Sequence, residues 1–186
     1  MDLPIYQVDA FTSSPLAGNP AAVMPLPEWL DDVTLLAIAR ENNLSETAFL
    51  VRLGEGRYHL RWFTPGREVE LCGHATLASA FVIFERLELE IGSVTFETAS
   101  GELGVRREDG MLWMDFPSRP AQPWEDGGVV AAALGAQPEE VLRTQLDDPE
   151  SDKILAVFPD AASVEALVPD MQKVNAIRAQ GIVATA

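Results

Sequence analysis

Short stretches that alternate apolar and polar residues, or form brief apolar runs bounded by turn formers, recur over the first 116 residues. Both patterns are typical of β-strands. They cover residues 3–11, 21–24, 48–53, 58–63, 94–98, 102–107 and 111–116. Asp109 and Gly110 lie between the last two stretches, and Asp-Gly between alternating runs favours a tight hairpin. The pattern therefore predicts a sheet built mostly from antiparallel neighbours.

Two helices are predicted among these strands, and they differ in their polar pattern. In residues 28–43, Leu30, Val33 and Ala37 fall on one stripe, which predicts a surface helix. Residues 74–87 carry apolar side chains on nearly every side, so this helix is expected to be buried all round. A curved sheet wrapped around this helix would bury both the helix and the inner face of the sheet. The predicted fold is α+β, with a curved, mostly antiparallel sheet, or open barrel, around a central apolar helix.

A domain boundary is predicted where Pro117, Pro120 and Pro123 interrupt the pattern. We expect an N-terminal domain at residues 1–118 and a partial second domain of similar architecture at 119–186. Its predicted elements are helices at 129–134, 163–167 and 171–180, a strand at 154–158 and a strand-like run at 181–186. Because the chain stops on that apolar run, the polypeptide is expected to be incomplete relative to its parent fold.

Acidic residues outnumber basic ones by 29 to 13, so the formal charge is −16. Such a surface repels phosphate backbones, and no nucleic-acid partner is expected. The N-terminus has no basic segment and no long apolar stretch, so we expect no secretion signal, no membrane partner and a cytoplasmic location. One cysteine and two histidines exclude an internal disulfide framework and a usual structural zinc site, and no metal is implied.

The start of the predicted buried helix is the first candidate site. Gly73, His74 and Ala75 stand where backbone N–H groups have no acceptor within the helix, so they can bind a carboxylate or a developing oxyanion. The His74 side chain adds a donor or a proton carrier. The alternative is structural: Gly73 makes the turn, and His74 caps the helix or packs.

Three more residues are candidates for chemistry. Glu46 stands in a predicted turn before an apolar strand, where a carboxylate is partly desolvated and suited to proton transfer, although most turn glutamates are solvated. Asn19 can hold a substrate carboxylate or carbonyl through its amide, or serve only the turn before Pro20. Cys72 is either a nucleophile or base at the helix start or, as for most lone cysteines, a small buried hydrophobe.

Five ordered segments together resemble the PhzF-like family of phenazine biosynthesis. Each segment is weak alone, whereas the ordered set is specific, and the resemblance spans essentially the whole chain. The segments are Asp9-Ala10-Phe11-Thr12, Gly18-Asn19-Pro20-Ala21-Ala22-Val23, Asn43-Leu44-Ser45-Glu46-Thr47-Ala48-Phe49, Arg61-Trp62-Phe63-Thr64-Pro65 and Glu70-Leu71-Cys72-Gly73-His74-Ala75-Thr76-Leu77-Ala78.

The resemblance implies a two-domain fold like diaminopimelate epimerase, with the active site in the cleft between the domains. It implies an isomerase in which the glutamate matching Glu46 acts as general acid and base on a small carboxylate-bearing substrate, without a cofactor. It further implies a homodimer and a set of substrate-binding residues in the cleft. These residues match Asn19, Ser45, Gly73, His74 and Ala75.

Residues 117–186 contain no match to the acidic residue and the Gly-Ser turn that the family's second domain contributes. Two alternatives to a glutamate-dependent isomerase therefore stay open. One is a cysteine-dependent racemase or epimerase acting through Cys72. The other is a truncated, catalytically inactive remnant that binds a small molecule or a protein partner. The sequence leaves the substrate undefined.

Overall fold

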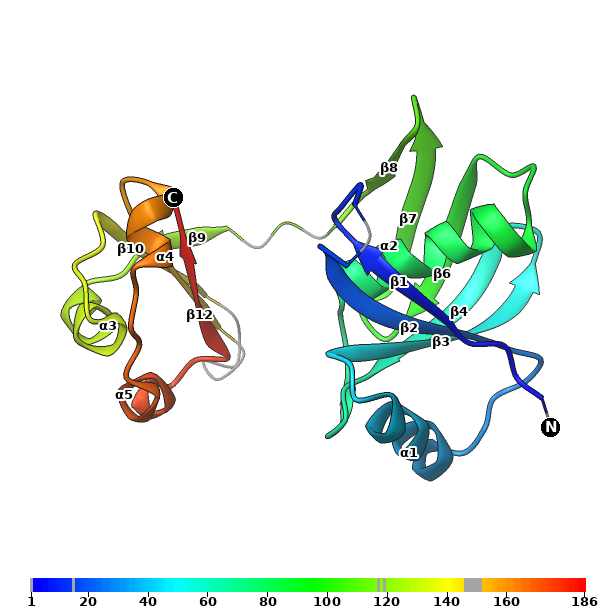
Figure 1. The fold of residues 1–186 in the computed structure, drawn as a ribbon, viewed down its shortest axis with the longest axis horizontal. Helices are drawn as coiled ribbons and strands as arrows, with labels where there is room; N and C mark the ends of the chain where they lie inside the picture. Colours follow the sequence, from blue (N-terminus) through cyan, green and yellow to red (C-terminus); the bar gives the residue numbers. More distant parts are fainter. Residues whose placement is uncertain (1, 15, 117, 119, 146–151) are drawn as a thin grey trace. The chain divides into compact units, whose positions relative to one another are not determined.

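The computed structural model describes residues 2–14, 16–116, 118, 120–145 and 152–186. The chain divides into two compact units, Met1–Phe116 and Pro117–Ala186 (Figure 1). Each unit contains one β-sheet, and we describe each by itself. No helix in the described part of the chain is long and apolar enough to cross a membrane.

The first unit contains an eight-stranded sheet with the order β1-β2-β3-β4-β6-β7-β8, and β5 pairs with β4. Its strands are β1 (Tyr6–Ala10), β2 (Asn19–Leu26), β3 (Glu46–Gly54), β4 (Arg57–Phe63), β5 (Glu68–Val69), β6 (Ser93–Thr98), β7 (Gly101–Glu108) and β8 (Met111–Met114). Most neighbours are antiparallel, as the sequence predicts. The predicted hairpin at Asp109-Gly110 joins β7 to β8, with both residues at positive φ.

Two strand pairs of the first unit are parallel and were not predicted by the alternating pattern. β2 pairs with β3 in parallel, and helix α1 (Asp32–Asn42) connects them. β4 pairs with β6 in parallel, and helix α2 (Gly73–Val82) lies in the connection between them. Parallel neighbours require such crossovers because a hairpin reverses the chain. The two predicted helices are therefore the crossovers of the sheet.

Helix α2 is the central apolar helix of the first unit (Figure 1). Its buried apolar residues belong to one core cluster with Leu50, Leu60 and Trp62 of the sheet. The cluster gives the predicted architecture of a curved sheet around an apolar helix. The expectation that this helix is buried all round is wrong, because Phe81 is 46% exposed and Leu87 is 37% exposed. The last turn is the π-helix η1 (Ile83–Leu87), which ends the predicted helix 74–87.

Helix α1 covers the opposite face of the sheet (Figure 1). Leu35 and Ala39 pack with Phe49 in a second core cluster, whereas the neighbours of Phe49 on β3 face α2. The predicted apolar stripe is wrong, because Val33 is 79% exposed. Asp31 caps the helix through its side chain, which accepts a hydrogen bond from the Thr34 amide, so the helix starts later than predicted.

The second unit contains a four-stranded sheet with the order β12-β11-β10-β9 and its own core cluster. Its elements are β9 (Ala121–Pro123), α3 (Gly127–Leu134), β10 (Glu140–Thr144), β11 (Lys153–Val157), α4 (Ala161–Glu165), α5 (Met171–Ala176) and β12 (Gly181–Thr185). Strands β9 and β10 were not predicted, and the helix predicted at 171–180 is shorter. The strand-like run at the chain end pairs with β11 in parallel.

Candidate active site

Glu46 is the first residue of β3, where the sequence predicted a turn. The turn that precedes it begins at Asn43, which ends α1 in the left-handed conformation with φ of 51°. The Asn42 side chain donates a hydrogen bond to the Thr47 hydroxyl and ties the helix end to the strand start. Glu46 lies opposite Ala21 in the parallel β2–β3 pair, so two strand starts meet at this edge.

The start of α2 forms the other wall of the site. Cys72 is the N-cap with an extended backbone, at φ of −146° and ψ of 113°, and its side chain does not cap the helix. Its carbonyl instead accepts hydrogen bonds from the Thr76 amide and the Thr76 hydroxyl. The Cys72 carbonyl is thus fixed in the first turn, whereas its sulfur is not used in capping and can contact other side chains.

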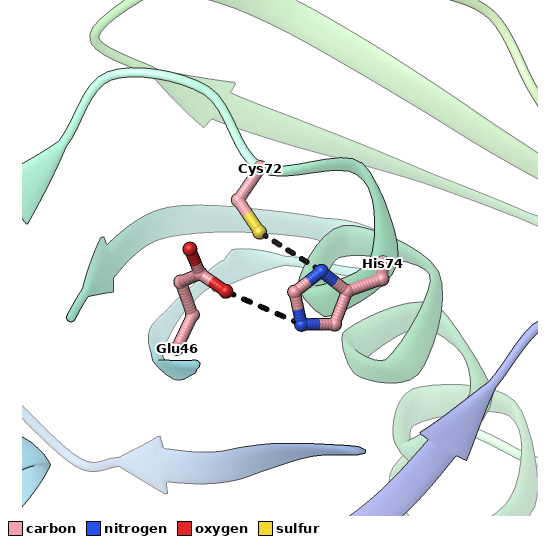
Figure 2. A group of neighbouring side chains, drawn as sticks. All are labelled: Glu46, Cys72 and His74. Atoms are coloured by element: carbon pink, nitrogen blue, oxygen red, sulfur yellow. Dashed lines mark hydrogen bonds and ion pairs between the residues drawn. The ribbon is translucent and has the colours of Figure 1, made fainter. Parts of the chain in front are cut away.

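Glu46, His74 and Cys72 meet at this place (Figure 2). The His74 Nε2 atom lies 3.3 Å from a Glu46 carboxylate oxygen, and the His74 Nδ1 atom lies 3.5 Å from the Cys72 sulfur. The His74 side chain is 10% exposed and the Glu46 side chain 19% exposed. The imidazole therefore stands between a carboxylate and a thiol in a largely buried setting.

Burial sets the protonation states of the two buried groups. It lowers the pKa of His74, while the Glu46 charge and the Pro20 backbone carbonyl act in the opposite direction. The imidazole is therefore neutral near pH 7. Burial, helped by the Glu46 charge and opposed by the Ala75 amide, raises the pKa of Cys72 to about 12. The thiol thus holds its proton.

The other predicted site residues lie around this group in different ways. Ser45 and Asn19 are exposed, and Asn19 begins β2 opposite Ala10. Gly73 is partly buried at the helix start. Ala75 is fully buried, and its backbone amide acts on the Cys72 thiol. Asn19 is linked to the site through its neighbour Pro20, whose backbone carbonyl acts on the His74 ring.

Sequence reasoning missed two features of the site. The contact of Cys72 with His74 was not predicted, because residues two apart do not face each other along a helix. The side chains of Met114 and Phe116 lie against the helix start, since a Cβ placed on Gly73 would meet each of them at 3.7 Å. The only signal for this second feature was their position at the end of the predicted hairpin.

The sequence model of the family described as phenazine biosynthesis-like protein matches residues 8–186. An uncharacterized isomerase of Pseudomonas aeruginosa is 49% identical over 186 residues, which is 100% of this chain and 69% of that protein. The chain belongs to the PhzF-like family. Because curated relatives in the family are named isomerases, it is a member of an isomerase family.

Solved structures of PhzF-like proteins have the same fold. A PhzF family protein of Enterococcus faecalis superimposes with a TM-score of 0.85 at 39% identity, over 95% of this chain and 65% of that one. A predicted epimerase of Pseudomonas aeruginosa superimposes with a TM-score of 0.75 at 23% identity, over 98% of this chain and 70% of that one. The predicted fold class is confirmed, and the chain spans about two thirds of the length of these relatives.

Proposed function

We propose that this PhzF-like chain carries the acid/base residue of a cofactor-independent isomerase, in which Glu46 moves a proton on a small carboxylate-bearing metabolite. The observation that carries the proposal is the position of the Glu46 carboxylate, 19% exposed and 3.3 Å from His74 Nε2 at the start of the central helix α2. A carboxylate fixed beside a helix start can act both as base and as acid.

The reaction is a shift of one proton and one double bond. Glu46 takes a proton from a substrate carbon, and the electron pair of the broken C–H bond becomes part of a new double bond. The former double bond supplies the electron pair that takes the proton back at another carbon. No electron acceptor is needed, because nothing is oxidised or reduced. Charge that develops on the substrate is stabilised by the amides at the helix start, where the macrodipole favours negative charge.

His74 supports Glu46 in this proposal as a neutral partner. Because burial lowers its pKa, the imidazole does not form a permanent ion pair that would hold the carboxylate unreactive. It can donate or accept a hydrogen bond as Glu46 changes its protonation state. The Gly73 amide, the Asn19 amide and the Ser45 hydroxyl are the groups that we propose to hold the substrate carboxylate.

A cysteine-dependent racemase or epimerase is less well supported at this site. A thiolate base needs a lowered pKa, whereas burial raises the pKa of Cys72 to about 12. The neutral thiol can still donate a proton, so the alternative keeps a specific test. A Cys72→Ala variant that loses proton exchange as completely as a Glu46 variant would favour the cysteine mechanism.

The test is exchange of substrate hydrogen with deuterated water. The purified chain is incubated with a panel of small unsaturated carboxylates, and loss of C–H signal is followed by proton NMR. Replacing Glu46 with Gln keeps the shape of the side chain and removes its charge. We expect the exchange rate to fall by roughly 100-fold to 10,000-fold, the usual contribution of a general acid or base.

Glu41→Gln is the matched control, because Glu41 is an exposed carboxylate near the end of α1. Its exchange rate should equal that of the unchanged chain. Undiminished exchange in the Glu46 variant would refute the proposed role. Binding of a panel compound without exchange would favour the noncatalytic remnant instead. The cytoplasmic location and the homodimer stay predictions. Sedimentation of the purified chain measures whether it forms a dimer.

A further inference from the structure

Three different metal-ligating side chains converge at one point of the first unit. One carboxylate oxygen of Glu46, the sulfur of Cys72 and a ring nitrogen of His74 all lie within 4.8 Å of one another (Figure 2). They come from two elements, because Glu46 begins β3 whereas Cys72 and His74 lie at the start of α2. A thiol, an imidazole and a carboxylate together form a ligand set typical of zinc, and not of magnesium or calcium.

A second observation points to a ligand at the same place. His74 is only 8% exposed, and its Nε2 atom makes no hydrogen bond of good geometry to the residues that the structure describes, although the Pro20 carbonyl lies close enough to raise the pKa of the ring. The atom lies 3.3 Å from Glu46, but the pair lacks the alignment of a hydrogen bond. Buried polar atoms normally have partners, so an unpartnered ring nitrogen aimed at a carboxylate calls for a further group.

We propose that Glu46, Cys72 and His74 bind a thiophilic divalent cation such as Zn²⁺, which occupies the site and blocks proton transfer by Glu46. The binding of the cation stands independently of the proposed isomerase activity, because it rests on the three ligands alone. Its effect on activity follows only if Glu46 is the acid/base group.

The distances require a modest rearrangement of side chains. Bond lengths of about 2.0–2.3 Å in tetrahedral zinc sites place neighbouring ligand atoms roughly 3.3–3.8 Å apart. The observed contacts of 3.3 Å and 3.5 Å lie in this range, although they use opposite nitrogens of the same ring. The cation therefore binds to one nitrogen, and the third ligand closes in by rotation of its side chain. A fourth position is left for water or substrate.

The protons and charges balance in this step. The Cys72 S–H bond breaks, its proton goes to solvent, and a sulfur–metal bond forms without oxidation or reduction. The thiolate and the Glu46 carboxylate then offset the two positive charges of the cation, while the neutral imidazole supplies an electron pair. The acidic surface of the chain, with a formal charge of −16, attracts cations toward the site.

Cobalt(II) is the probe, because it replaces zinc in tetrahedral sites and is coloured. Cys72 is the only cysteine of the chain, so a sulfur-to-cobalt charge-transfer band in the near ultraviolet reports this site alone. Titration of the purified chain is expected to give that band together with the intense visible bands of tetrahedral cobalt, saturating at one ion per chain. Added Zn²⁺ should remove both.

Variants assign the ligands. Cys72→Ser should abolish the charge-transfer band, and Glu46→Gln and His74→Gln should each raise the Kd for cobalt by at least about 10-fold, since each removes one ligand. His59→Gln and Glu41→Gln are matched controls, because His59 lies on β4 and accepts a hydrogen bond from the Trp29 indole, and Glu41 is exposed. Both controls should keep the Kd of the unchanged chain.

Two results would overturn the proposal. One is the absence of a charge-transfer band when the folded, unchanged chain is titrated to millimolar cobalt. The other is an unchanged Kd in both the Glu46 and the His74 variants, which would leave Cys72 as a lone ligand. If a variant fails to fold, X-ray absorption of the zinc-loaded unchanged chain decides: one sulfur among four ligands is expected, and a shell of oxygen and nitrogen alone contradicts it. Loss of proton exchange does not affect either readout, so the two proposals fail separately.

Discussion

Cys72 combines a position at a helix start with a thiol that keeps its proton. Helix N-termini usually lower the pKa of a cysteine, but here burial and the nearby Glu46 carboxylate outweigh the amides of the first turn. The residue is 8% exposed, so reagents also reach it with difficulty. Its reactivity in the folded chain should therefore be low, even though its contacts lie inside the candidate site.

We predict slow alkylation of Cys72 in the native state. With a pKa of about 12, the thiol forms far less thiolate at pH 8 than an unperturbed cysteine of pKa near 8.5. Iodoacetamide should therefore react at least roughly 100-fold more slowly with the folded chain than with the chain in urea. Intact mass measured over time gives both rates. Equal rates in the two states would show that the thiolate is accessible in the native chain.

Glu88 is the second residue whose environment leads to a prediction. It follows η1 and is 12% exposed. Its carboxylate accepts hydrogen bonds from the Arg52 guanidinium, the Tyr58 hydroxyl and the Gly56 amide. The Arg52 hydrogen bonds, followed by those of Tyr58 and Gly56, lower the pKa of Glu88 to about 2 against the effect of burial. The group joins the end of the central helix to the β3–β4 hairpin.

The stability contributed by Glu88 should therefore depend on pH. Its folded-state pKa is depressed, so the contribution is full above about pH 4.5 and is lost as the pH falls toward 2. Glu88→Gln should destabilise the chain by about 1–3 kcal/mol at pH 7, and the difference should vanish near pH 2. Urea unfolding across this range measures it. Glu85→Gln, on an exposed pair with Arg107, is the control and should change stability little.

The sequence identified Glu46 and His74 as candidates for one site, but it did not predict the contact that places Cys72 beside His74. The obstacle is local geometry. Residues two apart on a helix point in different directions, and the contact exists only because Cys72 is extended while His74 is already helical. This change of backbone conformation at the helix start is set by packing, and the spacing of residues in the sequence does not reveal it.

At the scale of elements, strands were easier to predict than their partners. Alternation of apolar and polar residues is the same in parallel and antiparallel strands, so it located β3 and β4 without indicating that β2–β3 and β4–β6 run in parallel. The β9 strand was not predicted because it has only three residues and contains a proline, whereas β10 was not predicted although it is as long as β11. Whether two neighbouring strands run in parallel depends on the connection between them, because parallel strands need a crossover that usually contains a helix.

The inward face of α1 was predicted wrongly for a different reason. The helix carries apolar residues on several sides, so its sequence fits more than one stripe. The structure selects the side that contains Leu35 and Ala39, because these residues meet Phe49 on the outer face of the sheet. Val33, on the stripe predicted from the sequence, stays 79% exposed.

The two faces of α1 should differ in their sensitivity to substitution. Leu35→Ala removes a side chain that is 0% exposed and should destabilise the chain by about 2–5 kcal/mol, because it leaves a cavity. Val33→Ala, on the same helix, should change stability by less than about 0.5 kcal/mol. Chemical unfolding followed by circular dichroism compares the two. A larger effect of the Val33 substitution would contradict the packing of this helix.

At the scale of the whole molecule, the cores belong to separate units. Two clusters of buried residues draw only on Met1–Phe116, and the third draws only on Pro117–Ala186. Cooperative unfolding depends on a shared core, so each unit should unfold in a transition of its own. The candidate site residues Glu46, Cys72 and His74 all lie in the first unit, so their geometry should depend on that unit alone.

We therefore predict that residues 1–116 fold in isolation. The fragment should unfold cooperatively in urea, at a midpoint within roughly 0.5 M of the corresponding transition of the whole chain, because both of its core clusters are built from its own residues. Residues 1–71 are the control: they keep β1 to β5 but lack α2, whose side chains fill the inner face of the sheet, and they should not fold. A fragment 1–116 without cooperative unfolding would mean that the first unit depends on residues of the second for its stability. In that case the contacts of Glu46 and His74 would also have to be measured in the whole chain.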